Sequence, residues 1–239
     1  MMGPTHALSG AVAWLAAVPL LQNADLMQGY AVHLSAGQIA AGTIVCAGAA
    51  MLPDIDHHDG TIANTFGVFT QVLCRAVGKI SGGHRHATHS ILFAVGAGFG
   101  ADWLATHYEP AWWVLLFLLV GLGLRGLGIR IDANDAYTGA LNALAAAALV
   151  YWVHDVDMDW AGYAVALGCL AHLAGDCCTP RGCPLLWPVP WRMGVALIPR
   201  TNGKAEKWVI TPLLTLGVVI LAVRTAVGDE ITDWLQSKA

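Results

Sequence analysis

Charged residues are scarce in this sequence. Only 12% of its 239 residues are Asp, Glu, Lys or Arg, whereas 56% are hydrophobic. A soluble domain usually carries about 25% charged residues, so the shortage indicates a protein that lies in lipid. The formal net charge of −4 also argues against a nucleic-acid partner, which needs a clustered basic surface. We therefore predict an integral membrane protein whose partner is the lipid bilayer, with no nucleic acid.

Several familiar motifs are also missing. The sequence has no Gly-x-Ser-x-Gly nucleophile motif and no phosphate-binding loop, which are signatures of many hydrolases and nucleotide-binding proteins. The first apolar run, from Ala7 to Leu21, has no basic segment before it and no clear small-x-small cleavage site after it. We therefore expect this run to be a retained membrane span rather than a signal peptide.

Long apolar stretches dominate what is present. A spanning helix needs about 20 apolar residues, within a range of roughly 17 to 25, and several of the stretches lie near the lower limit. We predict an all-α fold, a polytopic transmembrane helical bundle of about seven spans that forms one integral membrane domain over residues 1–239. The stretches are His6–Leu21, Gly37–Pro53, Thr88–Thr106, Ala111–Arg130, Thr138–Val153, Ala161–Asp176 and Trp208–Arg224.

Basic residues gather on one set of loops. Seven spans would place loops 54–87, 131–137 and 177–207 on the N-terminal side, while loops 22–36, 107–110 and 154–160 on the other side hold no Lys or Arg. The positive-inside rule then puts the N-terminus and the basic loops in the cytoplasm and the C-terminus outside. The basic residues of the first set and its helix ends are Arg75, Lys79, Arg85, Arg125, Arg130, Arg181, Arg192, Arg200, Lys204 and Lys207.

His172 and Asp176 form the first candidate metal motif. They stand four residues apart in an apolar stretch, so a helix would place them on the same face, one turn apart. An imidazole nitrogen and a carboxylate oxygen at this spacing can bind one metal ion. Ionisable side chains at membrane depth usually face a bundle interior or water. An alternative of equal weight is a His–Asp hydrogen bond that holds two helices together.

A second motif follows Pro53, which we expect to end the second span. Asp54 and Asp56 would point the same way from an extended segment, and two carboxylates so close repel each other unless a cation lies between them. A solvated acidic turn is the simpler alternative, but His57 and the next residue, also His, make it less attractive.

Three His and one Arg precede the third span. Neutral imidazoles such as those of His84 and His89 suit zinc, iron, manganese or nickel, and Arg85 can hold a phosphate or carboxylate. Ser90 or Thr88 can cap the helix that follows. A basic loop at the membrane surface would explain Arg85 but not the imidazoles. His6 is a lone His, normally only an interfacial residue, but it lies on the same side.

These motifs, in this order, resemble those of the YdjM-like membrane-bound metal-dependent hydrolases. The resemblance covers residues of about 1–90 and 160–220, whereas the helical block of about 95–155 shows no counterpart. It implies a bacterial inner (plasma) membrane location, a hydrolase activity and regulation by, or association with, the LexA repressor. The motif positions that it carries over are His6, Asp54, Asp56, His57, His84, Arg85, His89, His172 and Asp176. The run from His172 to Asp176 is also similar to part of the zinc phospholipase C and S1/P1 nuclease pattern, which suggests phosphoester cleavage.

We therefore predict a metal-dependent hydrolase that uses metal-activated water on a phosphoester or ester of a membrane lipid at the cytoplasmic face. One or two divalent ions, with zinc expected, would be bound by His6, Asp54, His84, His89, His172 and Asp176. Asp56 or His57 would act as general base or hold a ligand in place. Arg85, Arg181 and Arg192 would hold an anionic lipid head group, next to an interfacial loop around Trp187 and Trp191.

Two alternatives use the same residues. A divalent-metal transporter would place its ligands at mid-depth in the membrane, near breaks in helices, whereas these motifs cluster in loops and at helix ends on one side. A structural metal site would be closed, whereas a catalytic site keeps a position open for water. The sequence does not separate these two kinds of site, and it leaves the oligomeric state open.

Overall fold

The computed structural model describes residues 1–128, 135–154 and 156–236, the side chains of residues 135–139 and 227–236 excepted. Its elements are helical, and each predicted apolar stretch lies mainly in a helix. Arg130 lies outside the described residues. The elements are α1 (Gly3–Leu21), α2 (Ala24–Met27), α3 (Ala36–Ala49), η1 (Leu52–Asp56), α4 (Val68–Ile80), η2 (Ala87–His89), α5 (Ile91–His107), α6 (Glu109–Gly126), α7 (Asp135–Trp152), α8 (Ala161–Cys177), the π-helical turn η3 (Glu206–Ile210) and α9 (Thr211–Gln236).

The all-α prediction is confirmed, but seven spans are not. Within the described part of the chain, four segments are long and apolar enough to cross a membrane: Gly3–Leu21, Ala36–Asp56, Glu109–Gly126 and Glu206–Ala226. Ala140–Trp152 and Ala161–Cys177 are apolar but shorter, and α5 has 17 residues. Length and composition therefore support a polytopic helical bundle with at least these four spans.

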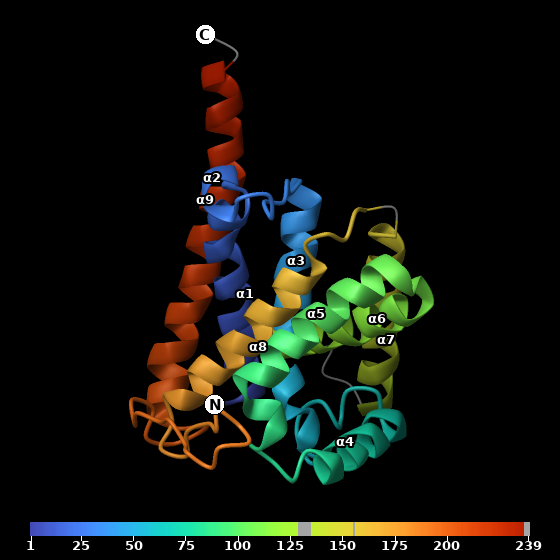
Figure 1. The fold of residues 1–239 in the computed structure, drawn as a ribbon, viewed down its shortest axis with the longest axis vertical. Coiled ribbons are helices and arrows are strands. Elements are labelled where there is room, and N and C mark those ends of the chain that lie inside the picture. Colours follow the sequence, from blue (N-terminus) through green and yellow to red (C-terminus); the bar gives the residue numbers. More distant parts are fainter. Residues whose placement is uncertain (129–134, 155, 237–239) are drawn as a thin grey trace.

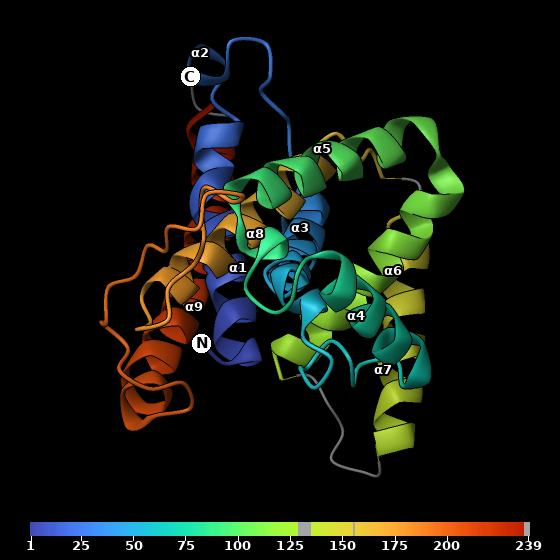
Figure 2. The ribbon, with the colours of Figure 1, turned by 60° about the horizontal axis from the view of Figure 1, so that its bottom comes forward.

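The helices are arranged so that the polar motifs gather at one end. In Figure 1, α1, α3 and α9 run nearly parallel, and α8 crosses between them toward the end where the chain begins. That end also carries η1, α4 and the long segment between α8 and α9, whereas α2 lies at the opposite end. Turning the molecule brings this polar end forward, with α4 and the α8–α9 segment on either side of the start of α1 (Figure 2).

Glycines let α1, α3 and α8 approach closely enough to bring their polar residues together. A Cβ atom at Gly10 of α1 would lie 2.5 Å from the carbonyl oxygen of Cys46 in α3, and a Cβ atom at Gly168 of α8 would lie 2.5 Å from the same oxygen. Close contacts between small residues are a common way to pack helices in membranes. Because of these contacts, the last turn of α8 lies against both the first turns of α1 and the end of α3.

Two local predictions for residues 53–87 are wrong. The segment that holds Asp54 and Asp56 is a 3-10 turn, Leu52–Asp56, rather than an extended strand, because Pro is well tolerated in the first turn of a helix. The two carboxylates therefore point to different partners. The segment 54–87, predicted as a polar loop, contains a helix, α4, that exposes apolar side chains.

Candidate metal centre

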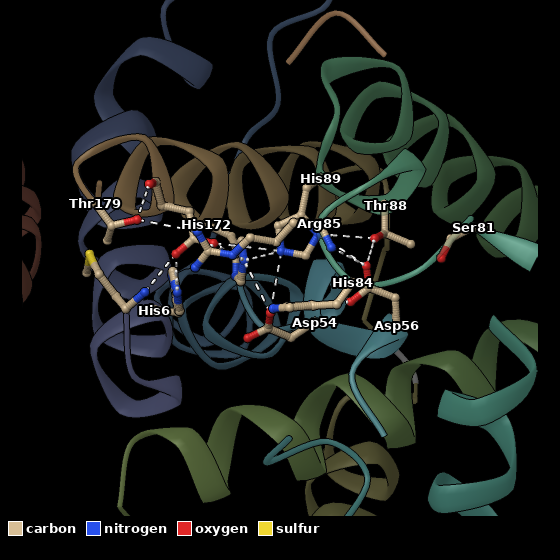
Figure 3. A network of polar contacts seen from close by, with 12 residues as sticks. His6, Asp54, Asp56, Ser81, His84, Arg85, Thr88, His89, His172 and Thr179 are labelled. Carbon is tan, nitrogen blue, oxygen red and sulfur yellow. Dashed lines mark hydrogen bonds and ion pairs between the residues drawn. The ribbon is translucent and has the colours of Figure 1, made fainter. Parts of the chain in front are cut away.

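The sequence motifs meet at the polar end of the bundle. Figure 3 shows His6 from α1, Asp54 and Asp56 from η1, His172 from α8, and the His84–His89 segment around one cluster of side chains. The predicted pairing of His172 with Asp176 on one helical face is confirmed, with His172 Nε2 3.8 Å from Asp176 Oδ2. His6, His89, His172 and Asp176 are almost fully buried.

The tautomer of His172 follows from its backbone partner. Nδ1 lies 2.8 Å from the carbonyl oxygen of Ala50, at the end of α3. A carbonyl oxygen can only accept a hydrogen bond, so Nδ1 carries the proton and the Nε2 of the neutral ring has a free lone pair. This is how metal-binding imidazoles are commonly oriented.

The tautomer of His89 follows from Thr88. The Thr88 hydroxyl donates its proton to Asp56 Oδ2, at 2.6 Å, so it must accept in its 3.1 Å contact with His89 Nδ1. Nδ1 is therefore the donor, and the Nε2 of the neutral ring again has a free lone pair. Asp56 thus orients His89 through one intervening hydroxyl.

The two free nitrogens face each other. His89 Nε2 lies 3.2 Å from His172 Nε2, and Asp54 Oδ1 lies 3.4 Å from the first nitrogen and 3.7 Å from the second. A tetrahedral zinc site with Zn–N distances of about 2.0–2.1 Å places neighbouring ligand atoms about 3.3 Å apart. Three acceptor atoms at this spacing repel each other unless a cation or a proton lies among them, so they fit a divalent metal.

Asp176 supplies a fourth possible ligand atom at this centre. Its Oδ2 lies 3.8 Å from the Nε2 atoms of both His89 and His172, and His89, His172 and Asp176 form a group able to hold one ion. Arg85 Nη2 forms an ion pair with this oxygen at 2.7 Å. Among the described residues, the oxygen has no hydrogen bond of standard geometry. It therefore remains available to a metal beside the guanidinium.

His6 lies on the other side of Asp176. Its Nε2 is 3.3 Å from Asp176 Oδ1, and its ring stacks on that of His172 with centroids 3.8 Å apart. The amino nitrogen of Met1 is 2.7 Å from the same oxygen. The buried Nδ1 of His6 has no hydrogen-bond partner in the described chain, and His6 forms a second ligand group with Asp54 and His172.

Asp56 is occupied by donors from the His84–Thr88 segment. Oδ1 accepts from His84 Nδ1 at 2.8 Å, while Oδ2 accepts from the backbone N–H of Arg85 at 3.0 Å and from Thr88 Oγ1. Arg85 has a positive φ of 62°, which is uncommon for a residue with a side chain, and the bond to Asp56 holds it there. These contacts suit a carboxylate that positions imidazoles. Asp54, Asp56, His84 and His89 nevertheless form a third possible ligand group.

Two carboxylates change the protonation of His89. Burial alone would lower the pKa of His89, but its contacts with Asp54 and Asp56 outweigh burial and raise the pKa above the ordinary value of 6.5. Below this raised pKa, a proton on His89 takes the place of a cation between these groups in the metal-free protein. A bound metal would displace that proton, because metal ligands must be deprotonated.

The buried centre opens onto a cavity of about 590 Å³ through Asp54 and Arg85. His57 and His84 also line this cavity, and their rings meet edge to face with centroids 4.6 Å apart. His57 Nδ1 accepts from the backbone N–H of Asp59 at 3.2 Å. A metal bound at the centre would therefore be reachable from this cavity.

The predicted substrate-binding arginines have different surroundings. Arg181 lines the cavity. Arg192 does not line it, and its Nη2 donates to the carbonyl oxygen of Arg85 at 3.1 Å, so it supports that loop. Arg85 itself contacts Thr179 Oγ1 and the Gly182 carbonyl oxygen, each at 3.4 Å. Arg200 also lines the cavity, although only its positive charge was considered in the sequence.

The supporting roles of several residues were not predicted from the sequence. Thr88 and the Ala50 carbonyl fix the two imidazoles, as described above. Glu206 is fully buried, and its two oxygens accept from the backbone N–H groups of Met2 and Asn202, at 2.6 and 2.7 Å. It therefore ties the start of α1 to the segment before α9. Its only signal was a carboxylate just ahead of an apolar stretch.

Comparison with known proteins assigns the chain to the same family that its sequence motifs resemble. The family described as YdjM inner membrane protein matches residues 1–132 and 138–229, which includes most of the block without a counterpart in the sequence motifs. Proteins named inner membrane protein YdjM from Escherichia coli (strain K12) and Shigella flexneri are each 27% identical over 173 residues. The matched part spans 70% of this chain and only 60% of each relative. No solved structure matches the chain.

Proposed function

The chain belongs to the YdjM family of inner membrane proteins, and on that premise we propose that it is a membrane-embedded, metal-dependent hydrolase. The observation that carries this proposal is the 3.2 Å separation of the two free nitrogens, His89 Nε2 and His172 Nε2. Because the Nδ1 atom of each ring donates a hydrogen bond, both Nε2 atoms are acceptors. Asp54 Oδ1 lies close to both, and the three distances match those between the ligand atoms of a metal ion.

His89, His172, Asp54 and Asp176 would hold the ion. His6 and His84 could bind a second ion or replace one of these ligands, because each belongs to a possible ligand group that includes Asp54. These nitrogen and carboxylate ligands suit zinc, although they also accept other divalent metals. A bound divalent metal supplies a Lewis acid that lowers the pKa of water to about 7.

The chain's own residues have distinct parts in such a reaction. Asp56 fixes His84 directly and His89 through Thr88, as carboxylates commonly do behind metal-bound imidazoles. His57 faces the cavity and can take a proton from water or give one to a leaving group. Arg181 and Arg200 place positive charge along the cavity wall, where they would bind an anionic group.

The position of the site favours an enzyme over a transporter. The ligands lie at the end of α8, the start of α1 and the short elements η1 and η2, rather than midway along broken helices. The cavity beside Asp54 leaves one side of the centre accessible, whereas a purely structural site would be closed by protein ligands. Both features support a hydrolase.

We infer a phosphoester or ester of a membrane lipid as the substrate, with the site at the cytoplasmic face. Apolar side chains in the α8–α9 segment, including Trp187, Val189, Trp191 and Leu197, are exposed at the same end of the bundle. Such residues suit the head-group region, and the basic loops follow the positive-inside pattern. A lipid head group would then reach the arginines without leaving the membrane surface.

A substrate screen tests this proposal. Purified protein loaded with zinc, manganese or iron would be offered lipid phosphoesters and other lipid esters, and product release would be measured. Asp54→Asn, at the boundary between centre and cavity, serves as the inactive control. We expect turnover with the wild type and none with the variant. A metal-loaded wild type that releases no product from any member of the panel would overturn the hydrolase proposal.

A further inference from the structure

Helix α4 lies across the polar end of the bundle and exposes an apolar face. Figure 1 shows it nearly perpendicular to α1 and α9. Phe69, Val72 and Ile80 are 62%, 58% and 87% exposed, and helical spacing places them on one side of the helix. Thr70 and Cys74 are buried on the other side. A helix of this kind, at the end of a membrane bundle, is suited to lie in the interface plane.

Two cationic side chains border this apolar face. Arg75 and Lys79 are exposed and stand one turn apart, on the same side as Val72 and next to the stripe of Phe69 and Ile80. Within the described residues neither has a carboxylate within ion-pair distance. Long basic side chains beside an apolar stripe can extend to lipid phosphates while the stripe enters the acyl region.

A second cavity, of about 580 Å³, lies between α4 and η1. Arg75 and Lys79 line it from α4, and His57 and His84 line it from the side of the metal centre. Gly78 allows the close approach of α4 to η1, because a Cβ atom there would lie 2.8 Å from the carbonyl oxygen of Asp56. His57 and His84 also line the first cavity, so these two imidazoles separate the two spaces.

Both carboxylates of this cavity already have partners. Asp56 accepts hydrogen bonds from His84, the Arg85 backbone and Thr88. Asp59 is exposed, and one of its oxygens lies 3.2 Å from His58 Nε2. Burial raises the pKa of Cys74 to about 11, so its thiol adds no negative charge. Arg75 and Lys79 have no such partner within the described residues, so their N–H donors are available to an anion.

We propose that α4 and η1 form a binding site for the head group of an anionic phospholipid. The phosphate would lie between Arg75 and Lys79, and the acyl chains would run along Phe69, Val72 and Ile80 into the membrane. The volume is within the range of about 300–1,000 Å³ that is usual for small-ligand sites. A lipid fits this geometry better than a free phosphate, because the cations and the apolar stripe lie side by side.

The site also offers a route to the metal centre. A lipid held at α4 would lie against the same His57 and His84 that face the first cavity. Delivery of this lipid as substrate rests on the proposed hydrolase function, but the binding itself does not. Lipid retention can therefore be measured on metal-free protein, where hydrolysis does not occur.

Native mass spectrometry of the full-length protein would test the site. Protein would be titrated with phosphatidylglycerol or with phosphatidylcholine of the same chains, and retained lipid would be counted. Each basic residue near an anionic lipid contributes about 1 kcal/mol, so Arg75→Gln with Lys79→Gln should weaken phosphatidylglycerol retention by about 30-fold. Lys204→Gln with Lys207→Gln removes the same charge from the same end and should retain the lipid.

Two further measurements distinguish a lost lipid site from a misfolded variant. Arg75→Lys with Lys79→Arg keeps both charges and should keep the preference for phosphatidylglycerol. A photo-cross-linking residue at Val72 in the otherwise wild-type chain should form phospholipid adducts, and added inorganic phosphate should not suppress them. Equal retention of both lipids by the wild type, or equal losses in the Arg75/Lys79 and Lys204/Lys207 variants, would overturn the proposal.

Discussion

Asp56→Asn should weaken metal binding without abolishing it. Asp56 is not one of the four residues proposed to hold the ion. Its two carboxylate oxygens instead accept hydrogen bonds from His84 Nδ1, the Arg85 backbone N–H and Thr88 Oγ1. Asparagine has nearly the same shape, but it replaces one oxygen by an amide N–H₂ group. One of these donors then faces another donor, and the imidazoles lose part of their orientation.

The size of the effect follows from the bond that is lost. A hydrogen bond to a charged acceptor contributes about 1.5–3 kcal/mol, and changes to residues behind metal ligands typically lower metal affinity about 10–100-fold. We therefore expect a zinc Kd that rises about 10–100-fold at unchanged stoichiometry. Asp56→Ala should be worse for folding, because it leaves several buried donors without an acceptor.

Competition with a chromophoric chelator would give the zinc Kd of each purified protein. Asp59→Asn is the matched control, because Asp59 is 76% exposed and only His58 forms an ion pair with it in the described chain. The control should bind zinc as the wild type does. If Asp56→Asn binds zinc with wild-type affinity, Asp56 does not position the imidazoles, and that part of the reasoning is refuted.

Three further predictions concern packing, pH and the cavity. Gly168→Ala should lower the free energy of unfolding by about 1–3 kcal/mol, because the new methyl meets the Cys46 carbonyl oxygen; denaturation in detergent would show it, and an unchanged midpoint would contradict it. Burial lowers the pKa of His89, but the contacts with Asp54 and Asp56 outweigh burial, and the pKa lies above 6.5. The metal-free protein should therefore lose stability as pH rises through that raised pKa, and zinc should restore it; a thermal midpoint that is flat from about pH 6 to about pH 9 would argue against this. Arg181→Gln should weaken inorganic phosphate binding to the metal-loaded protein about tenfold at constant metal content, as isothermal titration would reveal.

Much of the candidate site was visible in the sequence because its residues occur in compact motifs. His172 and Asp176 could be paired from helical spacing alone, and Ser90 caps α5 through a bond from the Phe93 backbone N–H. Sequence order also placed His6, Asp54 and His89 on one side of the predicted bundle, and the structure brings them together in one cluster. The charge count of the loops and the positions of the motifs agreed on that side.

The contacts that decide each residue's role could not be read from the sequence. Arg192 was expected to bind substrate, but it reaches the carbonyl of Arg85, a contact that depends on how the α8–α9 segment folds back. Ser90 or Thr88 was expected to cap a helix; Ser90 does so, whereas Thr88 bridges Asp56 and His89. Such roles depend on long-range packing, which local patterns do not encode.

Short helices were the other difficulty. The 3-10 turn Leu52–Asp56 follows from Pro53 starting a turn as well as ending a helix, and this changed the directions of Asp54 and Asp56. The helix α4 lies in a polar region between two motifs, so its apolar positions did not stand out. The proposed lipid site combines this exposed face with the cavity beside η1, and that juxtaposition depends on how α4 packs on η1.

Elemental analysis of the detergent-purified protein tests the central claim most directly. Wild type would be measured beside His172→Ala and Asp176→Ala, with His107→Ala, an exposed histidine on α5, as the control. We expect stoichiometric divalent metal in the wild type and the control, and its loss from both site variants. A wild type that holds no metal, and takes up none from zinc, manganese or iron, would contradict it and leave the cluster as a hydrogen-bonded helix-packing network.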